Sequence, residues 1–216
     1  MSWSLNEVEG LARKAARGAG FSWGLAEEAG IATRWLMAMG LPGATALAGL
    51  LTRNDGVTYT SICPVDTDGR WRARGGTLCP LICGAAICDH AARLAEDKRI
   101  ELGETAFPLL VLPFAAGAAQ LTGKQIEITW PGCAATIGPD GKPGLSETTS
   151  VETALTAWAS IRVTTGGNAG PRRAASRCEI PAAAAKTLAG FAHRTYAPDT
   201  PESRLSGAGA GLSDND

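Results

Sequence analysis

Three cysteines and a histidine lie close together in the middle of the sequence. Cys79, Cys83, Cys88 and His90 offer three thiols and an imidazole, a ligand set that zinc accepts. The two-residue gap typical of zinc knuckles and ribbons is absent from their spacing. On one helix, Cys88 would lie roughly 140° around the axis from Cys83, so the three thiols could not reach a single ion. The pattern therefore predicts small core residues and no metal site, and a zinc-stabilised module is the remotest functional hypothesis.

The start of the second predicted helix carries a possible pocket wall. Trp23 stands beside Gly24, whose missing side chain would let a ligand approach an exposed indole ring closely. A core or capping tryptophan is the alternative for Trp23. Glu27 and Glu28 follow in the first turns of this helix, where acids complement the helix dipole. The tryptophan and the two glutamates each suit a binding site or a purely structural role.

The last twenty residues contain groups that can bind ligands. Tyr196 is followed by Ser203 and Arg204, and a planar guanidinium suits a carboxylate or phosphate. Gly207 and Gly209 alternate with alanine, and a chain with so little bulk can lie against a ligand or another subunit. So much glycine is also typical of a disordered end. The sequence leaves both interpretations open.

Both ends of the chain resemble one family. The N-terminal pattern is SLNEVE followed by GFSWGLAEEAG, and the C-terminal pattern is RTYAP, then ESRL, GAGAG and DND. Together they resemble an uncharacterised bacterial family built on a domain of unknown function. The resemblance implies a bacterial, cytoplasmic protein and supplies no activity. It also raises Glu27 and the tail as candidate site residues, whereas the central cysteines lie outside the pattern.

Helices dominate the first quarter of the sequence. Ser4 and Glu7 fit a capping box that begins a helix, and Gly18 and Gly20 end it. A second helix is predicted from Ser22 to Met39, with Gly40 as a left-handed cap. A third, short helix is predicted over residues 43–53. Leu25 and Leu36 belong to an apolar face on which the first two helices are expected to pack as an antiparallel pair.

Mixed elements follow the turn at residues 54–56. Residues 57–62 are rich in β-branched side chains and predict a strand, and residues 66–76 predict an exposed loop or short hairpin. Helices are predicted over 81–94 and 109–121. Two strands, 125–130 and 133–137, flank a tight turn, and a further strand is predicted at 159–165. Pro181 begins a final helix that reaches about His193. Helices first and strands later, without βαβ alternation, favour an α+β fold with a helical hairpin or triplet packed on a central, mainly antiparallel sheet.

Composition excludes several classes of partner. The chain has 20 basic and 21 acidic residues and a net charge of −1, so it has no basic excess to neutralise phosphates. We therefore expect no nucleic acid, and the lack of a polybasic or membrane-spanning segment predicts no membrane partner. No export signal is visible at the N-terminus, so we expect a soluble cytoplasmic protein whose six cysteines are reduced.

These observations predict one globular domain over residues 1–195, including a helical subregion over 1–53, and a glycine-rich tail over 196–216. They do not identify the function. The favoured hypothesis is a small-molecule enzyme or binder with a pocket between the N-terminal helices and the tail. A non-catalytic accessory or assembly protein is the alternative, and a homo-oligomer stays open. We predict no cofactor, and the candidate ligand-binding residues are Trp23, Glu27, Tyr196, Ser203, Arg204, Gly207 and Gly209.

Overall fold

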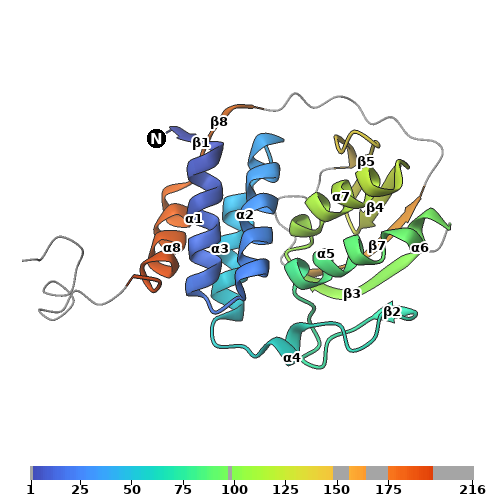
Figure 1. Ribbon diagram of the computed structural model, residues 1–216, viewed down its shortest axis with the longest axis horizontal. Coiled ribbons are helices and arrows are strands. Elements are labelled where there is room, and N and C mark those ends of the chain that lie inside the picture. Colours follow the sequence, from blue (N-terminus) through green and yellow to red (C-terminus); the bar gives the residue numbers. More distant parts are fainter. Residues whose placement is uncertain (1, 97–98, 148–155, 164–174, 197–216) are drawn as a thin grey trace, which may run out of the picture.

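The molecule combines a bundle of helices with a sheet that carries helices of its own (Figure 1). The computed structural model describes residues 2–96, 99–147, 156–163 and 175–196. Helices come first along the chain and most strands lie in its middle. The predicted α+β class is therefore confirmed.

Four helices form the bundle: α1 (Leu5–Gly18), α2 (Trp23–Ala38), α3 (Gly43–Asn54) and α8 (Ala182–His193). The Ser4 hydroxyl accepts a hydrogen bond from the amide of Glu7, and the Glu7 carboxylate accepts one from the amide of Ser4. This confirms the predicted capping box. Gly40 has φ +69°, as predicted for the residue that ends α2. Strand β1 (Ser2–Ser4) pairs antiparallel with β8 (Arg177–Glu179). The segment that precedes α1 therefore lies beside the segment that precedes α8.

Helix α1 is the centre of this bundle. It packs against α2, to which a short turn connects it, and also against α8 (Figure 1). At Gly18, a side-chain Cβ would lie 1.8 Å from the backbone oxygen of Phe191 in α8. The two backbones are in contact there, so only glycine fits.

The described residues of the larger sheet have the strand order β2-β3-β7-β4-β5-β6. Its strands are β2 (Arg70–Trp71), β3 (Ile100–Ala106), β4 (Ile126–Trp130), β5 (Cys133–Ile137), β6 (Pro143–Glu147) and β7 (Thr156–Val163). All pairs are antiparallel except β2 with β3. The hairpin of β4 and β5 turns at Gly132, as predicted. Alternate residues of both strands are buried, which is typical of a sheet with one covered face.

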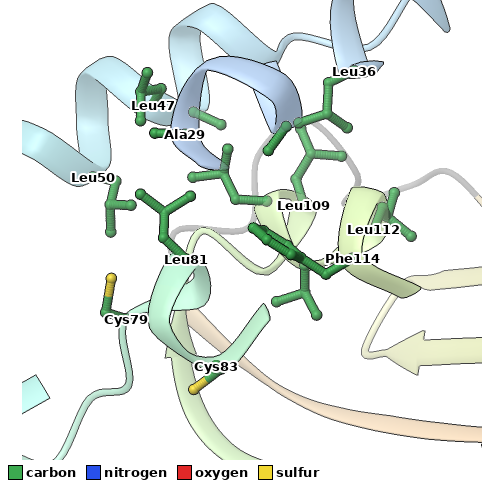
Figure 2. Packing of buried hydrophobic residues seen from close by; sticks show 14 of the residues in the cluster. Ala29, Leu36, Leu47, Leu50, Cys79, Leu81, Cys83, Leu109, Leu112 and Phe114 are labelled. Atoms are coloured by element: carbon green, nitrogen blue, oxygen red, sulfur yellow. The ribbon is translucent and has the colours of Figure 1, made fainter. Parts of the chain in front are cut away.

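Helices α5 (Pro80–Asp89), α6 (Ala91–Ala95) and α7 (Leu112–Thr122) pack on the sheet. The 3-10 turn η1 (Pro108–Val111) precedes α7, and Pro113 sits in the first turn of α7, where it removes no helical hydrogen bond. The bundle meets this half through α5, α7 and η1, which therefore form the layer between bundle and sheet. Figure 2 shows Leu81 of α5 lying among Ala29, Leu47 and Leu50 of the bundle, so one apolar core joins both halves.

One predicted element is wrong. Residues 57–62 were expected to form a strand, but Tyr59–Ile62 form a single helical turn, α4. Gly56, with φ +74°, turns the chain after α3. The hydroxyls of Thr58 and Ser61 then form a 2.8 Å hydrogen bond across α4. β-branched residues favour strands only where a neighbouring strand can pair with them. Strands β1, β3, β6 and β8 were not predicted from the sequence.

Candidate functional site

A cavity of about 570 Å³ lies where the bundle meets α4 and α5. Its wall is built from the α1–α2 turn, the first turns of α2, the end of α3, the following loop and α4, with one residue from α5. This volume is within the range of small-molecule pockets. The wall residues are Ala19, Gly20, Phe21, Ser22, Leu25, Asn54, Gly56, Val57, Thr58, Tyr59, Ile62 and Ile82.

Apolar side chains provide most of this wall. Phe21 and Ile62 are buried, Leu25 is half-buried, and Ile82 comes from the helix that links the bundle to the sheet. Val57 adds an apolar side chain to the wall and is 43% exposed. A ligand that covers such surface gains roughly 25 cal/mol for each Å² of apolar area removed from water. The wall therefore favours a molecule with an apolar body.

Asn54 is a buried polar side chain in this wall, whereas Ser22, Thr58 and Tyr59 are exposed. Only 7% of the residue is exposed, and its amide nitrogen Nδ2 is buried without a hydrogen-bond partner among the described residues. Its backbone oxygen is used, because it accepts a hydrogen bond from the amide of Val57. A buried polar group left unpaired costs about 1–3 kcal/mol. Because Nδ2 has almost no accessible surface, a ligand in the cavity reaches it only after neighbouring side chains move.

Two further hydrogen-bond donors, Ser22 and Tyr59, belong to the same wall. Ser22 caps α2, accepting a long 3.4 Å hydrogen bond from the amide of Leu25, so its own hydroxyl proton is free to donate. Tyr59 is 57% exposed at the wall. Burial raises the pKa of the Tyr59 phenol, and the neighbouring thiols of Cys63, Cys79 and Cys83 raise it further. Tyr59 therefore stays protonated and able to donate over the physiological range.

Charged residues stand just outside the cavity at the same end of the bundle. Arg17 donates a 2.6 Å hydrogen bond to the backbone oxygen of Phe21, and its guanidinium stacks 4.9 Å from the centre of the Trp23 ring. Arg194, after α8, holds both carboxylate oxygens of Asp55, at 2.7 and 2.9 Å. This pair lowers the pKa of Asp55 and ties the end of α8 to the residue after Asn54. Both arginines thus support the chain segments that form the wall.

Of the predicted site residues, the structure describes Trp23, Glu27 and Tyr196, and these three do not line one cavity. Trp23 is 67% exposed and lies against Arg17, next to the cavity and outside its wall. Glu27 is exposed on α2 and is not a wall residue. Tyr196 is 58% exposed and contacts His193 edge to face in a separate groove between α1 and α8. Ser203, Arg204, Gly207 and Gly209 lie outside the described residues.

The central cysteines are mostly core residues, as predicted. Cys79 and Cys83 are fully buried beside Leu81 (Figure 2), and burial raises the pKa of Cys79 to about 11 and that of Cys83 well above its usual value. Cys88 is partly buried, with its pKa raised to about 11, first by burial and then by Glu28 and Asp89. Within the described ranges, no cluster of three or more metal-binding side chains exists. These thiols are therefore poor nucleophiles at neutral pH.

Sequence analysis missed Asn54 as a site residue. The asparagine stands in Asn54-Asp55-Gly56, which is a turn signal, and turn asparagines normally face solvent. In the structure the third helix extends one residue further than predicted and places Asn54 in its last, buried turn. Only the packing of α4 and α5 over that turn makes it a cavity wall.

Comparisons with known proteins agree with the N-terminal part of the resemblance. Residues 3–79 match the family described as protein of unknown function (DUF3726), so the prediction of a family with an unassigned function is confirmed over this segment. The match covers less than half of the chain and includes every wall residue of the cavity except Ile82. No curated protein and no solved structure matches the chain. None of the described helices is long and apolar enough to cross a membrane.

Proposed function

We propose that this protein binds a small molecule with an apolar body in the cavity between the α1–α2 turn, α3 and α4. The observation that carries the proposal is a cavity of about 570 Å³ whose mostly apolar wall is interrupted by a few polar side chains, among them Ser22, Asn54 and Tyr59. Ligand pockets typically combine such apolar walls with a few polar groups that orient the ligand. The pocket predicted between the N-terminal helices and the tail involves residues outside the described ranges and stays a prediction.

The chemistry of the wall supports binding in preference to catalysis. Its polar side chains are those of Ser22, Asn54, Thr58 and Tyr59, and the Thr58 hydroxyl is already engaged with Ser61. Acid–base catalysis needs a group whose pKa lies near the working pH, and raising the pKa of Tyr59 moves it away from that range. These groups suit orientation of a bound molecule by hydrogen bonds.

A cytoplasmic location remains a proposal as well. It is supported by the thiols of Cys79 and Cys83, which lie in the apolar core as free cysteines. Free core thiols are typical of proteins kept in a reducing compartment.

Isothermal titration with octan-1-ol, an uncharged molecule with a flexible apolar chain, tests the proposal. We expect saturable binding with a dissociation constant of about 1 mM or lower, because several CH₂ groups at about 0.8 kcal/mol each offset the cost of association. The Ala19→Leu variant fills the cavity from the end of α1 and should weaken binding at least about tenfold, which is roughly 1.4 kcal/mol.

A matched variant separates this cavity from the rest of the surface. Ala189→Leu adds the same side chain to an exposed position of the α1/α8 groove and should leave binding unchanged. Absence of saturable heat up to the solubility limit would contradict the proposal. Equal losses in the two variants would contradict the assignment to this cavity.

A further inference from the structure

We propose that a short ribbon at the β2 edge of the sheet, formed by residues 64–65 and 72–74, is a docking surface for an extended acidic peptide of a partner protein (Figure 1). The ribbon shares no residue with the wall of the cavity beside α4, so this inference does not depend on the proposed function. Exposed arginines, a fixed backbone beneath them and an exposed apolar side chain among them carry it.

Exposed arginines alternate with buried residues along this part of the chain. Arg70, Arg72 and Arg74 are all exposed. Trp71 and Ala73, which stand between them, are buried. Alternate side chains of an extended segment lie on one side of it, roughly 7 Å apart. The burial of the intervening residues therefore turns the arginines toward solvent as a closely spaced group.

Arg72 and Arg74 carry charges that the described residues do not neutralise. Neither guanidinium forms a hydrogen bond or an ion pair with another described residue, and the exposed Glu104 on the neighbouring strand does not pair with them. Arg53 of α3 reaches the same turn and donates a 3.1 Å hydrogen bond to the hydroxyl of Thr77. A guanidinium binds a carboxylate through two parallel hydrogen bonds, so this group of arginines suits an acidic partner.

Other acidic side chains near the ribbon are already engaged. Glu101 lies opposite Arg70 in the pairing of β2 with β3, and its carboxylate is 3.5 Å from the guanidinium of Arg99. Asp68, in the loop that joins the two segments of the ribbon, pairs with Arg93 at 3.3 Å. These carboxylates therefore leave the charges of the 72–74 segment available.

The backbone beneath the arginines is fixed before any partner binds. Trp71 is 1% exposed, and its indole N–H donates a 2.9 Å hydrogen bond to the backbone oxygen of Thr67. The amide of Gly75 donates a 2.8 Å hydrogen bond to the backbone oxygen of Ser61, which ties the turn after the arginines to α4. A surface that is already ordered loses less conformational entropy when a partner binds.

An apolar side chain among the arginines favours a peptide over a nucleic acid. Pro64 and Ala73 form an antiparallel bridge, and the amide of Val65 donates a 2.9 Å hydrogen bond to the backbone oxygen of Arg72. Val65 and Arg72 are thus directly opposite each other and share one face. Val65 is 58% exposed. A peptide can cover it with an apolar side chain, whereas nucleic acids select proteins with a basic excess, and this chain has a net charge of −1.

Fluorescence anisotropy with a short labelled peptide in which glutamate alternates with serine tests this inference. At low salt we expect saturable binding, at least about tenfold tighter than that of the same peptide with glutamine in place of glutamate, because only carboxylates form charge-assisted hydrogen bonds. The double variant Arg72→Gln/Arg74→Gln should weaken binding of the glutamate peptide at least about tenfold. Both positions are exposed, so circular dichroism should show an unchanged fold.

A matched variant separates this surface from general attraction between charges. Arg13→Gln/Lys186→Gln removes the same charge from exposed positions of α1 and α8 and should change binding less than about twofold. Equal losses in the two double variants, equal binding of the two peptides, or no binding of either would overturn the docking surface. Tighter binding of an oligouridine than of the glutamate peptide, lost in Arg72→Gln/Arg74→Gln, would overturn the acidic peptide and assign the surface to nucleic acid.

Discussion

The cavity beside α4 and the groove between α1 and α8 are hollows of similar size on the helical bundle, and they differ in how their polar groups are satisfied. The cavity beside α4 has a volume of about 570 Å³, and the groove between α1 and α8 about 490 Å³. In the groove, Glu7 completes the cap of α1 and Tyr196 packs on His193. In the cavity, Asn54 is buried with its amide nitrogen unpaired within the described part of the chain.

This difference separates a consequence of packing from a candidate site. A groove forms wherever two cylindrical helices lie side by side, and its polar groups can be satisfied at the surface by neighbours and water. A buried amide without a partner costs stability and calls for an explanation beyond packing. Size alone would not distinguish the two hollows. The predictions below act on one hollow at a time.

The largest effect is expected at Gly18, where the backbones of α1 and α8 are in contact. Gly18→Ala would place a Cβ within 1.8 Å of the Phe191 backbone oxygen, so α1 and α8 must separate. We expect a loss of about 2–3 kcal/mol in the free energy of unfolding, measured by denaturant titration. Gly10→Ala in the same helix meets no atom within 4 Å and should be neutral or stabilising by up to about 1 kcal/mol. Equal stability of the two variants would show that α8 does not pack on α1 as described.

A smaller effect, of opposite sign, is expected in the cavity wall. Asn54→Leu removes the unpaired amide and adds apolar surface beside Leu25 and Ile82, so stability should rise by about 1 kcal/mol. Ligand binding should weaken in the same variant, because function and stability compete at such a residue. Tyr196→Leu in the groove is the comparison and should change stability by less than about 0.5 kcal/mol. Strong destabilisation by Asn54→Leu would show that this amide has a structural partner and would remove the main support for the cavity.

Much of the fold follows from local sequence signals, but the cavity does not. Ser4 with Glu7, Ser22, Gly40 and Pro181 mark helix ends through short-range hydrogen bonds and backbone preferences, so they predict the bundle correctly. The strand predicted over residues 57–62 does not form, because a strand also needs a neighbouring strand that is distant in the sequence. β3 was missed for a related reason, since Gly103 and a bulge interrupt its alternation.

The candidate site depends on contacts between residues far apart in the sequence. Ser22, Asn54 and Ile82 become one wall only when α2, α3 and α5 have packed. Trp23 and Tyr196 attract attention in the sequence because they are aromatic and stand at helix ends. The structure places them at two different surface positions. An asparagine in a turn signal gives no warning that it will be buried, which is why the site residue with the strongest physical argument was the one missed.

Chemical-shift mapping by NMR with octan-1-ol shows directly which of the two hollows binds the ligand. We expect shift changes for the amides of Gly20, Leu25 and Gly56 and for the side-chain NH₂ of Asn54, all from wall residues of the cavity. Resonances of Gly10, Ala189 and Tyr196, which line the α1/α8 groove, should stay in place. Shifts confined to the groove residues, or a silent Asn54 NH₂ under saturating ligand, would contradict the account.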